Sequence, residues 1–288
     1  MRLAPFQLHR PTELQTALEL RAQFGDDSAY YAGGTELLLA LKARVLRYEH
    51  LIDLKRIGGF DRIAVEKDEL VIGPLVTHLR LATDPLIREW LPAYAKLSDN
   101  VGNIRVRASG TLAGNLCFSE PHADPPALLC LLGATLTLSG PDGERSVPMA
   151  EFILGPFTTA RADDEILTAI RVPLPTAGEQ FCYRSFGHLE YPAVGVAAAY
   201  QSQAGAPRYR VWIGCIGDNP IHAEPVEAAL AGVPPQALSD VLPQAAEAMA
   251  AELPASDDIY GSADYKRHLA AVFIGRAVLE SAGVAGGR

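Results

Sequence analysis

The feature that most constrains this sequence is a short strand that runs directly into a pair of glycines and then into a helix. The residue pattern predicts a strand over Ser28–Ala32, a turn at Gly33–Gly34 and a helix over Thr35–Ala43. Glycine has no Cβ, so the backbone N–H groups of such a turn can approach an anion closely. Strand, glycine turn and helix is an order that aims these groups at a phosphate. A plain chain reversal is the more frequent use of a glycine pair and stays open as the alternative.

A second glycine-rich segment, Gly110–Asn115, has the sequence Gly-Thr-Leu-Ala-Gly-Asn. We interpret it as a second turn with exposed backbone donors, to which Thr35, Thr111 and Asn115 add neutral side-chain donors. Each segment alone is a weak signal. Two of them in one domain could hold both halves of a pyrophosphate.

Several well-known nucleotide and hydrolase motifs are missing from the sequence. It contains no G-x-G-x-x-G, which argues against a Rossmann dinucleotide site, and no G-x-x-x-x-G-K-[ST], which argues against a P-loop NTPase. A G-x-S-x-G elbow and an H-E-x-x-H zinc helix are absent as well. A pyrophosphate site here would therefore belong to another fold.

Composition and charge narrow the class of protein further. The chain has 288 residues, 49% of them hydrophobic and 20% charged, which is typical of a globular protein with one large or two modest domains. A formal net charge of -9 argues against nucleic acid as a partner, because such a partner requires a basic face. No stretch approaches the roughly 18 apolar residues of a membrane span, and the first residues lack an apolar signal core. We therefore predict a cytoplasmic protein.

The four cysteines, Cys117, Cys130, Cys182 and Cys215, lie far apart and form no C-x-x-C pair. This spacing suits neither a zinc site nor an iron–sulfur cluster held by this chain alone. Buried free thiols in a reducing compartment are the expected state.

Hydrophobic periodicity predicts two domains. Helices are expected over Pro11–Phe24 and after Asp124, and strands over His50–Leu54, Glu69–Gly73, Thr135–Leu138, Arg145–Val147 and Glu165–Val172. The segment Pro173–Gly178 is the best candidate linker. Beyond it we expect paired strands over Val194–Tyr200 and Tyr209–Ile216, followed by helices that include an amphipathic run from Tyr265 to Ala277. The predicted architecture is α+β, with domains 1–176 and 177–288.

The two glycine segments together resemble a known family. Ala32–Glu36 and Thr111–Asn115 are similar to the double-glycine motifs in the flavoprotein subunits of the xanthine dehydrogenase / CO dehydrogenase family of molybdenum hydroxylases. The resemblance continues through Ser119–Leu128, which is similar to a family segment ending in Asp-x-x-Pro-Ala-Leu, and through Glu165–Leu167 and Tyr183–Arg184. It spans the whole chain in the same order.

The resemblance implies a fold, a cofactor and a set of contacts. The fold would be an FAD-binding domain of the vanillyl-alcohol oxidase (PCMH-like) type with two α/β subdomains, followed by a smaller C-terminal domain of antiparallel sheet and helices. FAD would be bound non-covalently, with both glycine segments around its diphosphate and ribityl chain, Asp124 near the adenosine half and Ile166–Leu167 beside a ring. The implied cofactor contacts are Ala32, Gly33, Gly34, Thr35, Glu36, Val101, Gly102, Val106, Arg107, Gly110, Thr111, Gly114, Asn115, Asp124, Ile166, Leu167, Arg184 and Tyr191.

The sequence departs from the family pattern at two positions of the second segment. Ala113 stands where the family commonly has glycine, so this turn must avoid the left-handed region there. Ser109 replaces a frequent arginine and leaves Arg107 as the expected basic contact. Both departures bear on the geometry of the phosphate site and leave the identity of the ligand unchanged.

Four of the residues in these motifs also have ordinary structural interpretations. Asp124 precedes two prolines, as a helix N-cap does, and we predict that role together with the FAD contact. His122 is predicted to be an exposed loop histidine. Arg184 serves either the flavin ring or a surface salt bridge, and Tyr191 either stacks on the flavin or only packs.

The function implied is electron transfer, with no catalytic residue and no metal on this chain. Electrons would pass from [2Fe–2S] clusters on a small partner subunit to FAD and then to an external acceptor. Substrate oxidation would take place at a molybdopterin-type cofactor on a large partner subunit, and the assembly implied is a dimer of heterotrimers. The alternative is a stand-alone flavin oxidase or a nucleotide-binding module, which would need its own substrate cavity with a base or a covalent flavin link. No histidine or cysteine motif suggests such a link.

Overall fold

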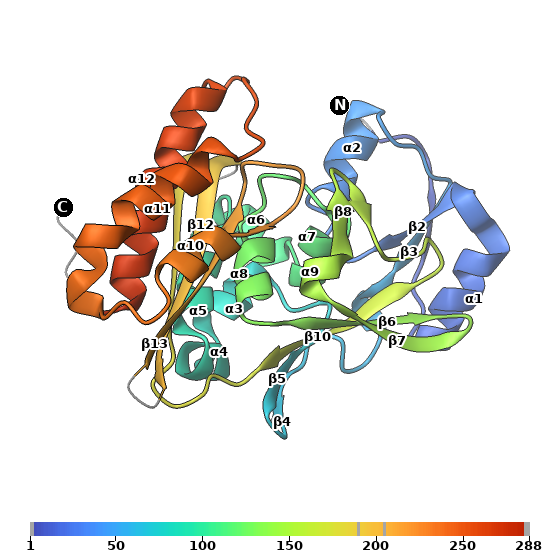
Figure 1. The fold of residues 1–288 in the computed structure, drawn as a ribbon. Coiled ribbons are helices and arrows are strands. Elements are labelled where there is room, and N and C mark those ends of the chain that lie inside the picture. Colours follow the sequence, from blue (N-terminus) through green and yellow to red (C-terminus); the bar gives the residue numbers. More distant parts are fainter. Residues whose placement is uncertain (1–2, 189–190, 204–205, 285–288) are drawn as a thin grey trace.

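The computed structural model describes residues 3–188, 191–203 and 206–284. Within these ranges the chain builds sheets of three, five and four strands and one small two-stranded sheet. The N-terminal sheet and the C-terminal helices lie at opposite ends of the molecule, with the five-stranded sheet and a group of short helices between them (Figure 1).

The first sheet is parallel, with strand order β1-β3-β2. Parallel neighbours need crossover connections, and two helices supply them. The elements are β1 (Gln7–His9), α1 (Leu14–Phe24), β2 (Ser28–Tyr31), α2 (Leu37–Ala43) and β3 (His50–Asp53). The helix expected from Pro11 begins at Leu14, and α2 begins after Thr35 and Glu36, which belong to the preceding turn.

The second sheet is antiparallel, with strand order β4-β5-β10-β6-β7. Its strands are β4 (Ile63–Glu66), β5 (Glu69–Ile72), β6 (Thr135–Gly140), β7 (Gly143–Pro148) and β10 (Ile166–Pro173). Between β5 and β6 the chain forms α3 (His78–Thr83), α4 (Pro85–Trp90), α5 (Pro92–Ser98), α6 (Ile104–Ser109), α7 (Leu112–Phe118) and α8 (Pro125–Leu131). Between β7 and β10 come α9 (Met149–Phe152), β8 (Ile153–Gly155) and β9 (Thr158–Thr159).

The third sheet is antiparallel and consists of β11 (Gln180–His188), β12 (Tyr191–Gln203), β13 (Ala206–Gly214) and β14 (Ile221–His222). The predicted pairing of Val194–Tyr200 with the following strand is confirmed by the register, in which Gly195 faces Gly214 and Tyr200 faces Tyr209. Helices α10 (Glu224–Ala229), α11 (Leu238–Ala251) and α12 (Ala263–Ser281) follow.

The C-terminal sheet is covered on both faces. One face packs on α11 and α12 in a core that includes Cys182, Val196 and Phe273. The other face, with Tyr183 and Ala197, joins the large core that contains residues of α3, α4, α5, α7 and α8, in which Leu128 is fully buried. Because successive side chains of a strand point to opposite faces, neighbouring residues of β11 serve different cores. The predicted α+β fold class, with a smaller domain of antiparallel sheet and helices at the C-terminus, is confirmed.

The cysteines lie largely as expected, with three of the four buried. All four thiols are free; Cys130, Cys182 and Cys215 are buried and Cys117 is partly exposed. In the described parts of the chain no group of three or more His, Cys, Asp or Glu side chains is arranged to hold a metal ion. Nor does any helix in those parts have the length and apolar character needed to cross a membrane.

Candidate cofactor site

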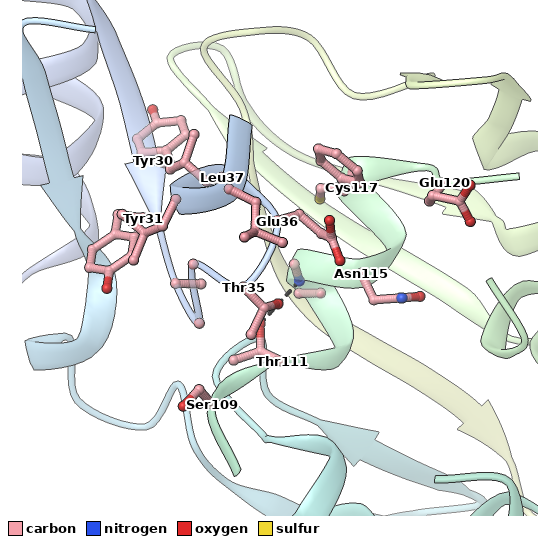
Figure 2. A pocket seen from close by; sticks show the side chains of 18 of the residues that line it. Tyr30, Tyr31, Thr35, Glu36, Leu37, Ser109, Thr111, Asn115, Cys117 and Glu120 are labelled. Carbon is pink, nitrogen blue, oxygen red and sulfur yellow. Dashed lines mark hydrogen bonds between the residues drawn. The ribbon is translucent and has the colours of Figure 1, made fainter. Parts of the chain in front are cut away.

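A cavity of about 940 Å³ lies where the first sheet meets the helices of the second subdomain. This volume is at the upper end of the range of ligand sites in proteins. Figure 2 shows Thr35 and Glu36, from the turn after β2, beside Thr111, the N-cap residue of α7, and Asn115, from α7. Both glycine segments that the sequence singles out therefore line this cavity.

The two glycine segments are in direct contact at one point. A Cβ added to Gly33 would lie 2.2 Å from the carbonyl oxygen of Ser109 and 2.9 Å from the Cα of Gly110. No side chain fits at position 33 without moving this backbone. The glycine is therefore needed for the approach of one segment to the other, in addition to any approach of a ligand.

Position 34 requires glycine for a different reason. Its φ is +73°, which is in the left-handed region, and a Cβ there would lie 2.1 Å from the Tyr31 ring. The Tyr31 ring also carries the Lys55 ammonium 3.5 Å from its centroid, and Lys55 forms an ion pair of 2.8 Å with Asp53. The turn is therefore held by the strand that precedes it.

The second glycine segment is not the turn that the sequence predicts. Thr111 caps α7 by accepting a hydrogen bond of 3.1 Å from the Gly114 N–H, and Gly114 lies in the first helical turn. Ala113 is also inside α7, so the alanine that departs from the family pattern has a backbone that any residue adopts. The prediction of a glycine turn at 110–115 is therefore wrong, because a capped helix N-terminus takes its place.

Most of the predicted cofactor contacts line this one cavity. They are Ala32, Gly33, Gly34, Thr35, Glu36, Val101, Gly102, Val106, Thr111, Gly114, Asn115, Asp124, Ile166, Leu167 and Tyr191. Gly110 does not line it; a Cβ added there would lie 3.3 Å from Thr35 Oγ1 and 3.4 Å from the His78 ring. Residues far apart in sequence are thus brought together in the way the resemblance implies.

Arg107 is not among the lining residues. Its guanidinium donates to the carbonyl oxygens of Val101 and Gly102, at 3.3 and 2.9 Å, and so holds the loop before α6. The cations that do line the cavity include Arg105 and Lys42, neither of which the sequence analysis assigns to the site. The sequence offers one indication of Arg105 as a candidate, because it lies two residues from Arg107 on the same short helix.

Arg184 is also outside the cavity lining. It forms an ion pair with Glu280 of α12, on the face of β11 opposite to Tyr183. The alternation of side chains along β11 explains this placement. Of the two interpretations left open by the sequence, the structure shows the salt bridge.

Asp124 lines the cavity and stands at the predicted N-cap position of α8, but its side chain does not cap the helix. Its backbone is already helical and its side chain makes no capping hydrogen bond. The carboxylate instead accepts a hydrogen bond of 2.6 Å from the Tyr183 hydroxyl. Burial raises the pKa of Asp124 to about 6, while the hydrogen bonds from Tyr183 and Ser185 act in the opposite direction.

One end of the cavity carries an aromatic cluster. The Tyr191 ring stacks on Tyr260 with centroids 5.7 Å apart, and His122 contacts both rings edge-on. His122 is predicted to be an exposed loop residue, but its side chain is only 24% exposed and its Nδ1 lies 2.9 Å from Glu120. Other lining residues of the cavity are Tyr30, Arg161 and Ile166. The Tyr30 hydroxyl donates a hydrogen bond of 3.3 Å to the Asp164 carbonyl oxygen.

Two buried polar atoms of lining residues fit a polar ligand. His78 Nδ1 and Asn115 Oδ1 are buried and, within the described parts of the chain, accept or donate no hydrogen bond. A buried polar atom without a hydrogen-bond partner lowers the stability of the fold, so a bound ligand that supplies a partner is favoured. Burial, with a smaller contribution from Arg107, lowers the pKa of His78 to about 4, so its ring is neutral at pH 7. A ligand with hydroxyl groups and phosphate oxygens matches this donor and acceptor set.

The fold and the cavity together define a protein that binds an extended nucleotide cofactor between two subdomains. The family models agree with this class. Residues 4–175 match the FAD binding domain in molybdopterin dehydrogenase, and residues 183–281 match the CO dehydrogenase flavoprotein C-terminal domain. The chain belongs to this family of FAD-binding flavoproteins, and the predicted family and cofactor are confirmed.

Individual relatives match along almost the full chain. The carbon monoxide dehydrogenase medium chain of Afipia carboxidovorans is 34% identical over 280 residues, which is 95% of each chain. The caffeine dehydrogenase subunit beta of a Pseudomonas species is 29% identical and covers 98% of this chain and 96% of its own. In the crystal structure of quinoline 2-oxidoreductase from Pseudomonas putida 86, a chain that is 28% identical superimposes with a TM-score of 0.91, covering 98% of this chain and 99% of its own.

Proposed function

We propose that this chain is the electron-transfer subunit of a molybdenum hydroxylase. In this proposal it receives electrons from [2Fe–2S] clusters of a partner subunit and passes them from FAD to an external acceptor. Bound FAD would supply the chemistry, because a flavin accepts electrons singly and can deliver them in pairs. The protein would bind the cofactor, orient it and exclude water from it.

The observation that carries the proposal is the variety of substrates among the relatives. Their names refer to carbon monoxide, caffeine and quinoline, which share no functional group, yet each of these three chains matches this one over at least 95% of its own length. A subunit common to such different oxidations is expected to serve the step that they share. That step is the removal of electrons, since the substrate differs in each case.

The residues of the cavity support binding and orientation. The contact between Gly33 and Ser109 brings both glycine segments to one cavity, and Lys42 and Arg105 offer positive charge to a diphosphate. At the end with Tyr191, Tyr260 and His122, aromatic rings provide a surface against which a flat ring system could stack. Ile166 and Leu167 are apolar wall residues of the same cavity.

We further propose the remaining parts of the assembly. A large subunit with the molybdopterin-type cofactor and a small subunit with the iron–sulfur clusters would be the partners, arranged as a dimer of heterotrimers in the cytoplasm. Within this chain we propose a domain boundary between residues 176 and 177, for which the two family models, ending at 175 and starting at 183, provide support.

Cofactor removal from the assembled complex tests the proposal. The complex is purified with its neighbouring gene products, stripped of FAD, and compared with the same sample after FAD is restored. Without FAD, substrate should still reduce the molybdenum and iron–sulfur centres, and reduction of the acceptor should stop. Turnover of the organic substrate by the isolated FAD-loaded chain would instead support a stand-alone flavin oxidase.

A further inference from the structure

The cavity wall that contains Asp124 is held by the C-terminal sheet. The Tyr183 hydroxyl, on β11, donates to Asp124 Oδ1 at 2.6 Å, and both side chains are buried. Two residues before Asp124, the His122 carbonyl accepts a hydrogen bond of 3.3 Å from Cys215 Sγ. These two contacts join the segment 122–124 of the FAD-binding domain to β11 and to the residue after β13, which follow their partners by 59 and 93 positions.

The C-terminal sheet has a specific place for the Tyr183 hydroxyl. A Cβ added to Gly195, on the neighbouring strand β12, would lie 2.0 Å from this hydroxyl and 3.3 Å from Cys215 Sγ. Gly195 therefore leaves the room in which Tyr183 reaches Asp124. Cys215 has a φ of +64°, which is rare for a residue other than glycine and is a strained conformation. The absence of a side chain at Gly195 and the strained backbone of Cys215 thus both occur beside the Tyr183 hydroxyl.

Acceptor capacity remains on the Asp124 carboxylate after its internal contacts. A carboxylate has about four lone-pair positions, and Tyr183 and Ser185 each donate one hydrogen bond to it. The residue also lines the cavity, although it is only 9% exposed. A buried carboxylate at a cavity wall is suited to accept a hydrogen bond from a ligand hydroxyl.

We propose that Tyr183 is a positioning residue of the FAD site, which holds the Asp124 carboxylate where it accepts a hydrogen bond from a hydroxyl group of the cofactor. The proposal rests on the cavity being the FAD site. It makes the C-terminal sheet a part of that site, because a residue outside the FAD-binding family model fixes an acceptor inside it. The hydroxyl groups of FAD are on its ribityl chain and its ribose.

The charges around Asp124 determine how the site should respond to pH. From β11 it faces Tyr183 and Ser185; beyond β13 it faces Cys215; on its own loop are Glu120 and His122, which bond to each other. Burial raises the pKa of Tyr183 and of Cys215 well above their usual values, so both stay neutral near pH 7. Because the Tyr183 hydrogen bond favours the charged carboxylate, loss of the hydroxyl should raise the pKa of Asp124 further.

The test is FAD titration of the apo-chain by flavin fluorescence between pH 5 and 8. The variants are Tyr183→Phe, Asp124→Asn, the double variant, and Tyr209→Phe as a matched control. Tyr209 is a buried tyrosine of the same sheet whose hydroxyl donates to the Val233 carbonyl at 2.9 Å, away from the cavity. We expect Tyr183→Phe to weaken FAD binding about tenfold at pH 7 and to move the acid loss of affinity to higher pH. Tyr209→Phe should bind as the wild type does.

The double variant separates positioning from general damage. If Tyr183 acts through Asp124, the double variant should bind FAD no more weakly than Asp124→Asn alone, and neither should show the pH step. Additive losses, or affinity of Tyr183→Phe within twofold of the wild type with an unchanged pH profile, would overturn the proposal. If Gly33→Ala abolishes FAD binding while Tyr183→Phe leaves it intact, only the positioning role is lost. If neither changes FAD binding, the assignment of the cavity itself is wrong.

Discussion

Gly33 lies directly against the carbonyl oxygen of Ser109, at a distance that leaves no room for a methyl group between them. This contact joins the turn after β2 to the end of α6, which are separated by 76 positions along the chain. The cavity opens beside it. The position of both glycine segments therefore depends on a single backbone approach, which explains the need for glycine there.

We expect Gly33→Ala to lower FAD affinity roughly tenfold or more, because relieving the overlap with Ser109 costs about 1–3 kcal/mol. FAD released by acid precipitation, relative to protein, measures the loss. Gly275→Ala is the control, since a Cβ at Gly275 in α12 meets nothing within 4 Å. That variant should keep its FAD and be more stable by about 0.5–1 kcal/mol. Full FAD content in Gly33→Ala would contradict the role of this contact.

Gly34→Val should also lose FAD, for a reason that involves Tyr31. The substituted side chain would meet the Tyr31 ring and would require a φ of +73°. Replacing the ring in the double variant Gly34→Ala/Tyr31→Ala should restore part of the affinity lost in Gly34→Ala, because only the backbone strain of about 1–2 kcal/mol remains. Equal FAD affinity of the single and double variants would show that Tyr31 is not the obstacle.

The stability of the apo-chain should fall in acid partly through His78. The folded state has a His78 pKa of about 4, whereas the ordinary value is 6.5, so the unfolded chain binds a proton first as the pH falls. The contribution of His78 to the free energy of unfolding is therefore complete above pH 6.5 and decreases towards pH 4. At pH 5 the loss is about 2 kcal/mol.

Urea unfolding at several pH values checks this contribution. Asp124 acts in the opposite sense, because its raised pKa makes stability fall as the pH rises through about 6. The comparison of wild type with His78→Phe isolates the histidine, and the variant should show a smaller loss of stability between pH 7 and pH 5. Parallel curves for the two proteins would mean that the pKa of His78 is close to 6.5 in the folded state.

Arg184→Gln should leave FAD binding and the flavin reduction potential unchanged. Arg184 pairs with Glu280, and both side chains are more than a third exposed, so the variant should lose at most about 1 kcal/mol of stability. Potentiometry of the FAD-loaded chain, with Gly275→Ala measured in parallel, gives the comparison. A clear shift in potential would restore the role beside the flavin ring that the resemblance implies.

Much of this site follows from local sequence. A pattern of a few residues predicts the strand Ser28–Ala32 with its glycine pair, which the structure has as β2. Similar patterns predict strands in the places of β6 and β7, and the pairing of β12 with β13. These features depend on turn chemistry and on the two-residue period of strands, both of which can be read along the chain. The same holds for the cavity contacts from residues 32–36.

Other parts depend on contacts between distant residues. Asp124 precedes two prolines, a pattern typical of an N-cap, but its carboxylate accepts a hydrogen bond from Tyr183 instead. A partner 59 positions away cannot be predicted from a local pattern. Thr111 and Gly114 form a capped helix instead of a turn, because the backbone of Gly110 and Leu112 is fixed by His78 and Val76. Arg184 misses the cavity because the face that each residue of β11 presents is set by the packing of α12.

The most direct test of the electron-transfer function is the order of events after substrate is mixed with the oxidised, assembled complex. Rapid-mixing absorbance and freeze-quench spectra follow the iron–sulfur centres and the flavin in the same sample. The function proposed for this chain predicts that the iron–sulfur signals change first and that flavin bleaching follows, with the bleaching reduced in proportion to the FAD lost from a complex containing Gly33→Ala. Flavin bleaching that precedes the iron–sulfur signals, or that occurs when substrate is mixed with this chain alone, would contradict it.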